Sequence, residues 1–495
     1  MKRLWILLGA GAFLLCIVTP LFAQPDIKTT GQIRVRYRDW NDFLMDNDLA
    51  ANTTSGRNRH YFDIRTRFGV KAAIEPGLTG AIEIERYDDF GTHSLVNAGV
   101  SPSDATALGI PTGTAGLYFR QAWADWVIPG TPVHIAGGRM LPTYGGSIVL
   151  DGSTYGMDGV QTYGQWGPVT VSAFYWKPQN GDTPGTQDRR FANNDFDIYG
   201  GNVKYWLLPK NSIELYGFLS NDKTRAKTLS IANTPGICTG APGDCADTSE
   251  YFIGLAFFGA TQNDIFTYRL EGAYQGGIAR KSVSPTAALG NAAGDIDRSA
   301  FMIAGGVGFG IIPGVVTLKL DAGYASGDDN VADNEFNNFA SIYGLGQPTL
   351  MFQEGNPFGN TSSAQFGNNT TNRAYNVTTL GTADADLAFS TTDTGARFSP
   401  GLLYFKPGVK WVPLKQLSIT GDVGVLWAPS TPSSVDSFMG IEPDILISWQ
   451  VYKNLVVNGY FGYLFTGDFF DSARAGVANN TDDPWFGRLE FILTF

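Results

Sequence analysis

The chain ends in the stretch Trp485-Phe486-Gly487-Arg488-Leu489-Glu490-Phe491-Ile492-Leu493-Thr494-Phe495, in which apolar and polar side chains largely alternate up to a terminal phenylalanine. Alternation with a period of two is typical of a β-strand that has one apolar face and one polar face. The same pattern occurs near the start, in Gly31-Gln32-Ile33-Arg34-Val35-Arg36-Tyr37, and around residues 62–68, 82–85, 316–321 and 419–427. We therefore expect an all-β fold from about Gly31 to the end of the chain.

The breaks between these stretches are alternately short and long. Short turns fall near residues 75–77, 129–131, 165–167, 208–210, 260–262, 312–313, 413–414 and 451–453. Long polar loops lie between them, near residues 40–59, 89–115, 140–155, 178–195, 221–248, 276–298, 326–395, 428–437 and 465–483. Counting a strand on each side of every break predicts a single antiparallel transmembrane β-barrel of about 18 strands. Its short turns would be periplasmic and its long loops outer, and closure would satisfy every backbone hydrogen bond in lipid.

Composition narrows the class of protein. The 495 residues are 43% hydrophobic and only 16% charged, include 61 glycines, and carry a formal net charge of −11. An acidic chain lacks the basic footprint that nucleic-acid binding needs, so we expect no nucleic-acid partner. Mean hydropathy is −0.07, and no apolar run of about 18 to 20 residues follows the first 23 residues, which excludes a bundle of membrane helices.

Residues 1–23 have the features of a secretory signal peptide. Met1-Lys2-Arg3 supplies a positive start, Leu4 to Val18 is almost wholly apolar, and Leu21-Phe22-Ala23 offers a small residue at a cleavage point. We expect residues 24–495 to form the barrel in the outer membrane of a Gram-negative-type cell, in contact with outer-membrane lipid and lipopolysaccharide. Since exported proteins meet an oxidising compartment, Cys238 and Cys245 in the loop 221–248 are expected to form a disulfide.

The sequence gives no sign of catalysis or of a cofactor. The only histidines, His60, His93 and His134, fall in separate segments, and no HExxH, CxxCH or GxSxG motif occurs. The loop 326–395 holds oxygen ligands that could bind calcium, but it lacks EF-hand spacing. We therefore expect no enzyme activity, no cofactor and no metal site. Asp328, Asp329 and Asp333 are weak candidates for metal ligands, and we expect them to lie in a solvated outer loop.

Charged side chains gather on the face of the strands that would turn away from lipid. Two interpretations remain open: pairs of arginine and carboxylate stiffen the barrel, or a basic stripe guides anionic solutes, as rings of Arg or Lys do in pores. The stripe Arg34, Arg36, Arg65 and Arg67 would set a preference for anions, although the inward charges are nearly balanced. The candidate pore-lining residues are Arg34, Arg36, Arg38, Arg65, Arg67, Glu83, Glu85, Arg269, Glu271, Lys319, Asp321, Asp422 and Arg488.

The chain resembles outer-membrane barrels of the alginate-export type. The resemblance rests on short motifs spread along the chain: residues 31–37, Gly138-Arg139-Met140-Leu141-Pro142-Thr143-Tyr144-Gly145-Gly146 with Asp158-Gly159-Val160, Tyr324-Ala325-Ser326-Gly327-Asp328-Asp329, and Gly440-Ile441-Glu442-Pro443-Asp444. It implies 18 antiparallel strands, an Arg-rich lumen, and loops or a turn that gate the passage of an anionic polyuronate. The chain departs from the family in having Met140 where the family usually has Gln, and in its long loop 326–395.

We therefore expect a passive outer-membrane channel for hydrophilic solutes, with anionic polyuronates among the candidates. One alternative is a general or specific nutrient porin of another family. The other is a barrel sheath around a periplasmic or extracellular electron-transfer cytochrome complex, whose haem-binding chains would be separate because this chain has no haem attachment motif. The sequence names no periplasmic partner.

Overall fold

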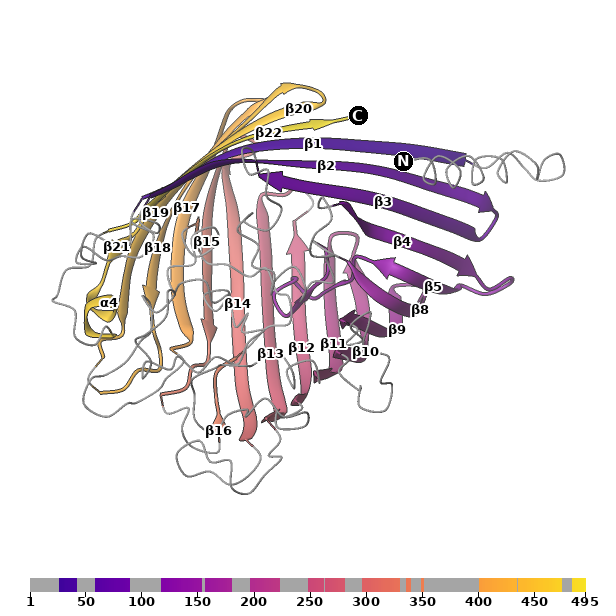
Figure 1. Cartoon of the computed structure of the whole chain (residues 1–495), viewed down its shortest axis with the longest axis horizontal. Coiled ribbons are helices and arrows are strands. Elements are labelled where there is room, and N and C mark those ends of the chain that lie inside the picture. Colours follow the sequence, from indigo (N-terminus) through magenta and orange to yellow (C-terminus); the bar gives the residue numbers. More distant parts are fainter. Residues whose placement is uncertain are drawn as a thin grey trace, which may run out of the picture.

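The computed structural model describes residues 26–41, 58–89, 117–153, 156–179, 196–222, 248–261, 263–280, 296–329, 335–339, 349–350, 400–433, 435–473 and 483–495. Within these residues, eighteen long strands form the wall of a barrel (Figure 1). They are β1 (Asp26–Asn41), β2 (Asn58–Glu75), β3 (Leu78–Asp89), β4 (Leu117–Val127), β5 (Val133–Met140), β8 (Met157–Trp166), β9 (Val169–Gln179), β10 (Phe196–Leu208), β11 (Asn211–Asp222), β12 (Thr248–Ala260), β13 (Phe266–Arg280), β14 (Ile296–Ile312), β15 (Val316–Ala325), β17 (Leu402–Leu414), β18 (Leu417–Trp427), β19 (Phe438–Tyr452), β20 (Leu455–Tyr463) and β22 (Trp485–Thr494).

Each wall strand pairs antiparallel with the next, and the first pairs with the last. The β1–β22 register runs from Gln32 opposite Thr494 to Asn41 opposite Trp485, which closes the barrel. Shorter elements add to this wall: β16 (Glu335–Phe336) pairs parallel with β14, and β21 (Phe465–Thr466) pairs with β19. The predicted number of 18 antiparallel strands is confirmed.

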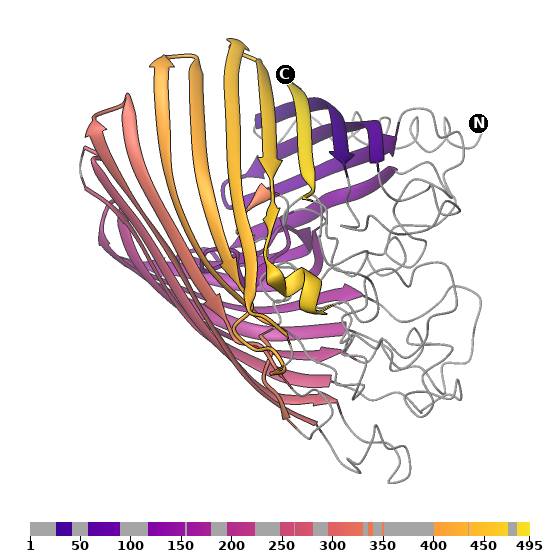
Figure 2. The ribbon, with the colours of Figure 1, turned by 90° about the vertical axis from the view of Figure 1, so that its left-hand side faces the viewer.

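The alternation of short turns and long connections is also confirmed. The β2–β3 turn is only Pro76-Gly77 and the β8–β9 turn only Gly167-Pro168, with φ of 89° at Gly77 and 59° at Gly167. These positive φ values favour glycine because it has no Cβ. The short turns lie together at one end of the wall (Figure 2). The first residue of β1, Asp26, and the last residue of β22, Thr494, lie at the same end.

The apolar face of each strand points outward. Phe62, Phe68 and Ile82 are 47 to 54% exposed, whereas Asp63 on the same strand as Phe62 is fully buried. In a soluble β-sandwich the apolar side chains lie inside and the charged side chains lie on the surface. Here the apolar side chains lie outside and the charged ones inside, as expected for a barrel wall that faces lipid. Half-exposed tryptophans stand at the turn ends of four strands, as an aromatic girdle at the membrane interface does: Trp126, Trp166, Trp411 and Trp449.

The buried apolar core lies inside the barrel. Phe174, Trp176, Ile198, Phe218 and Phe252 project inward from β9 to β12 and are almost inaccessible. The segment that carries β6 (Thr143–Tyr144) and β7 (Leu150–Asp151) packs against them, since the ring of Tyr144 stacks on that of Phe174. The helix α4 (Asp468–Ala473) contacts a different part of the wall, the strand β19 (Figure 2). Among the described residues, no helix is long and apolar enough to cross a membrane.

Candidate functional site in the barrel lumen

One buried carboxylate joins three arginines of β1. Arg34, Arg36 and Arg38 occupy alternate positions and therefore share the inward face, and Asp63 of β2 stands opposite Arg36 in the strand register. Arg36 Nε donates to both carboxylate oxygens of Asp63, at 2.8 and 3.0 Å. Arg38 Nε lies 3.1 Å and Arg34 Nη2 lies 3.9 Å from the same carboxylate. Asp63 is therefore the hub of this group.

A second group lies one strand further along the wall. Arg67 of β2 donates to Glu85 of β3, and so does the hydroxyl of Tyr118 on β4. Arg120 of β4 donates from Nη1 to Glu83 at 2.6 Å, and its Nε lies 3.9 Å from Glu85. Sequence reasoning missed Arg120, because the register between β3 and β4 shifts at this point and Arg120 is the extra residue of a bulge.

The strand that closes the barrel extends the group. Glu490 of β22 lies 3.6 Å from Arg34 Nε, and the guanidinium carbon of Arg488 lies 3.7 Å from the ring centroid of Tyr460. Arg65 Nη2 donates to the neutral side chain of Gln32 at 2.8 Å. We call this set the arginine cluster: seven guanidiniums and four carboxylates among the described residues, namely Arg34, Arg36, Arg38, Arg65, Arg67, Arg120 and Arg488 with Asp63, Glu83, Glu85 and Glu490.

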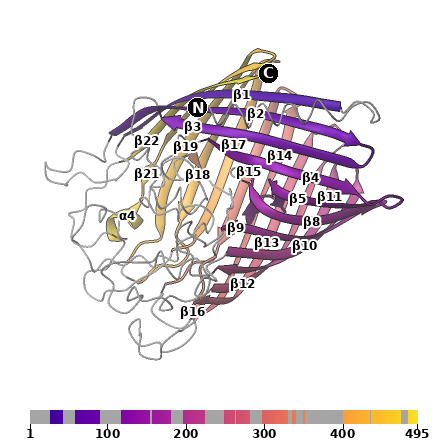
Figure 3. The same cartoon turned by 45° about the vertical axis from the view of Figure 1, so that its right-hand side comes forward.

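The other predicted lining residues lie on the opposite wall, which Figure 3 shows behind β1 to β4. There Arg269 pairs with Asp321 at 2.7 Å, and Lys319 lies 3.6 Å from Asp422, so these charges are matched one to one. Glu271 belongs to neither group, because it accepts from the Tyr216 hydroxyl at 2.5 Å. The predicted pore-lining residues thus fall into separate groups, and the predicted stripe lies wholly within the arginine cluster, which has an excess of positive charge among the described residues.

Residues 141–153, which we call the inward segment, fold into the barrel, although the sequence predicted an outer loop at 140–155. Their ribbon lies within the outline of the barrel in Figure 1. The reason is the apolar run Ile148-Val149-Leu150, which is buried against the inner wall. Tyr144 accepts a hydrogen bond from Trp176 Nε1 at 3.1 Å, and burial raises the pKa of its phenol above the ordinary value, which keeps it protonated.

Several predicted residues fall elsewhere. Cys238, Cys245 and Asp333 lie outside the described residues, as does the signal peptide. Asp328 is buried and accepts a hydrogen bond from the Asn337 backbone at 3.0 Å. Asp329 is exposed, and in the part of the chain that the structure describes no three His, Cys, Asp or Glu side chains are grouped as metal ligands.

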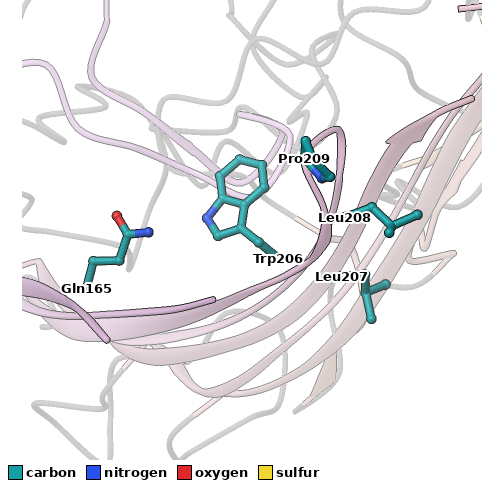
Figure 4. Close-up of a pocket in the computed structure, with 5 residues that line it drawn as sticks. All are labelled: Gln165, Trp206, Leu207, Leu208 and Pro209. Carbon is teal, nitrogen blue, oxygen red and sulfur yellow. The ribbon is translucent and has the colours of Figure 1, made fainter. Parts of the chain in front are cut away.

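A shallow pocket of about 520 Å³ lies at the turn end of the barrel, lined by Gln165 and by Trp206 to Pro209. Figure 4 shows Gln165 and Trp206 on one side of the strands and Leu207 on the other. The pocket contains no charged side chain, although Lys204 Nζ lies 4.8 Å from the Trp206 ring centroid. Among its lining residues, the pocket therefore offers no charged group to a solute.

Comparisons with known proteins agree with this architecture. A family model described as alginate export matches residues 119–390, more than half of the chain. No curated protein matches significantly. Among solved structures, Pseudomonas aeruginosa OccK9 (OpdG) is 11% identical, with 95% of this chain and 98% of that chain covered and a TM-score of 0.52.

Two further structures are similar. Acinetobacter baumannii OccAB1 is 10% identical, with 95% and 97% of the two chains covered and a TM-score of 0.51. A BenF-like porin from Pseudomonas fluorescens is 12% identical, with 95% and 99% covered and a TM-score of 0.49. Similarities at such low identity concern the fold alone, whereas the family match covers most of the wall from β4 to β15. The chain therefore belongs to the alginate-export family and is an outer-membrane β-barrel channel of a Gram-negative cell.

Proposed function

We propose that the channel passes hydrophilic solutes passively and prefers anions, and that the arginine cluster supplies the preference. The observation that carries this proposal is the excess of three positive charges, seven guanidiniums against four carboxylates, on one stretch of the inner wall. An excess of one sign next to low-dielectric walls concentrates counter-ions in a channel. Polyuronates, which carry one carboxylate per sugar, are the anionic solutes that the family suggests.

Differences in their contacts support two roles for the arginines, one group that holds the wall together and another that faces the solute. Arg36 is committed to buried Asp63 through two short hydrogen bonds, so it acts mainly as scaffold. The partner of Arg65 is the neutral Gln32, so its charge is not cancelled in that contact. Paired guanidiniums keep spare donors, since each has five N–H groups in a planar fork. We therefore assign Arg65 a larger share of the anion preference than Arg36.

The test is the reversal potential of Arg65→Gln under a salt gradient in planar bilayers. We expect a lower anion-to-cation permeability ratio and weaker current block by oligouronates, with block by neutral oligosaccharides of equal length unchanged. Arg86→Gln is the matched control, because Arg86 is an exposed residue on the outward face of β3. The same ratio in folded Arg65→Gln and wild-type protein would contradict the proposal. A changed ratio without change in oligouronate block would keep anion preference and reject polyuronates.

A further inference from the structure

We infer that the inward segment is a fixed partition of the lumen, and that Glu214 and Glu271 are the positioning residues that hold it and thereby set the size limit for solutes. The inference goes beyond the proposed function, because it concerns the size of the solute and not its charge. It rests on four observations: a carboxylate clamp, a glycine pair that fits the clamp, an apolar underside, and a tie to the arginine cluster.

The clamp consists of the carboxylates of Glu214 and Glu271. It joins the tip of the inward segment, Gly145 and Gly146, to two strands of the wall. Glu214 of β11 accepts from the backbone N–H of Gly145 at 3.3 Å, and Glu271 of β13 accepts from that of Gly146 at 2.6 Å. Both carboxylates are almost fully buried. Tyr216 donates to the second oxygen of Glu271, and Lys204 lies 3.6 Å from Glu214, so each carboxylate is itself held in place. A carboxylate that accepts from a backbone N–H makes a charge-assisted hydrogen bond, which is stronger than a neutral one.

The two glycines at the tip are required by this contact. A Cβ on Gly145 would lie 2.5 Å from one oxygen of Glu271, and a Cβ on Gly146 would lie 2.5 Å from the other. Gly145 also has a φ of 59°, in the left-handed region that favours glycine. A side chain at either position would push the tip away from the carboxylates. The Gly-Gly pair and the two glutamates therefore fit each other as one unit.

The underside of the inward segment is packed against the wall. Val149 and Leu150 are completely buried, and the ring of Tyr144 stacks on that of Phe174 with centroids 4.3 Å apart. The two ends of the inward segment, which form its neck, are joined by a hydrogen bond of 2.7 Å from Gly152 N to the Pro142 carbonyl oxygen. Apolar burial and hydrogen bonds at the tip and the neck hold the segment in one position, because interiors packed in this way have few alternative arrangements.

The far end of the inward segment reaches the arginine cluster. Arg120, which holds Glu83, also donates to the carbonyl oxygen of Ser153. The segment thus spans from β13 at its tip to β4 at its end, and it covers the aromatic part of the wall between them. Apart from Arg120, the arginine cluster stands on β22, β1, β2 and β3, outside the stretch of wall from β4 to β13 that the segment spans. A solute would therefore pass between the segment and the arginine cluster, and displacing the segment would widen that path.

The experiment compares Glu214→Ala/Glu271→Ala with wild-type protein in planar bilayers and measures exclusion of uncharged polyethylene glycols of graded size. We expect conductance to rise about two-fold and larger polymers to enter, since pore size limits both. Amide hydrogen exchange of residues 141–153, read by mass spectrometry, should become faster in this variant. Uncharged polymers separate this result from the anion preference, so either proposal can fail while the other stands.

Three further variants serve as controls. Glu271→Gln keeps an acceptor oxygen for Gly146 and should retain the wild-type polymer limit. Asp125→Asn removes an inward carboxylate of β4 whose partners are Tyr163 and His134 rather than the segment, and it should leave the limit unchanged. Gly146→Val keeps both carboxylates but displaces the tip, so it should raise the polymer size limit. If the double variant does not fold, Gly146→Val alone tests whether the position of the segment sets this limit. A wild-type polymer limit or unchanged hydrogen exchange in folded Gly146→Val or Glu214→Ala/Glu271→Ala would overturn the inference.

Discussion

Asp63→Asn is the substitution that most directly tests how the arginine cluster is held together. It removes the charge from a fully buried carboxylate that accepts from Arg36 at 2.8 and 3.0 Å and lies 3.1 Å from Arg38 Nε. Asparagine keeps one acceptor oxygen and adds an amide that would point N–H groups at other N–H groups. Breaking a buried ion pair by removing one partner costs about 3 to 5 kcal/mol, and we expect the free energy of unfolding to fall by that amount.

The loss can be measured by urea unfolding of the protein in lipid vesicles, followed by tryptophan fluorescence. Arg36→Gln/Asp63→Asn removes both partners and should be more stable than Asp63→Asn alone, because fewer unpaired guanidiniums remain. Asp63→Asn also raises the excess positive charge of the arginine cluster from three to four, so the anion-to-cation permeability ratio should increase. A loss of stability below about 1 kcal/mol, within the range of an exposed pair, would refute the view that Asp63 is the hub.

Two other predictions follow from single positions. Gly159→Ala should lower the free energy of unfolding by about 1 to 3 kcal/mol in the same urea assay, because its Cβ would lie 2.1 Å from the Tyr175 carbonyl oxygen, which is backbone and cannot move aside; stability equal to wild type would mean that β8 and β9 are spaced differently. Cys238 and Cys245 should be found linked in unreduced peptides by mass spectrometry, and two thiols that alkylate freely in the native protein would reject that disulfide.

The strand map could be predicted because its signals are local. A period of two, broken by turn residues such as Pro76-Gly77, appears in the sequence without knowledge of distant contacts. The inward positions of Arg34, Arg36 and Arg65 followed from the same alternation. The pairing of three arginines with Asp63 did not, because it depends on the register between β1 and β2, which alternation alone leaves open.

The inward segment was missed because its contacts are far apart in the chain. Gly146 and Glu271 are separated by 125 positions, and no local pattern connects them. One signal was present: the apolar run Ile148-Val149-Leu150 is unusual in a stretch assigned to an outer loop, and it indicates burial. Arg120 was missed for a different reason, since the bulge in β4 breaks the alternation that located the other inward arginines.

The pairing of β1 with β22 has a consequence for how the barrel is made. Backbone hydrogen bonds between Gly31 and Phe495, at 2.7 and 3.0 Å, join the first wall strand to the last residue of the chain. Until β22 has been delivered, β1 presents an open edge that can pair with other chains. The joint also pairs the two wall strands that are farthest apart in the sequence, so it closes the longest loop of any strand pair and carries the largest loop-closure entropy. A barrel without β22 would therefore be an unsealed sheet rather than a smaller channel, because β1 and β20 would each be left with an open edge.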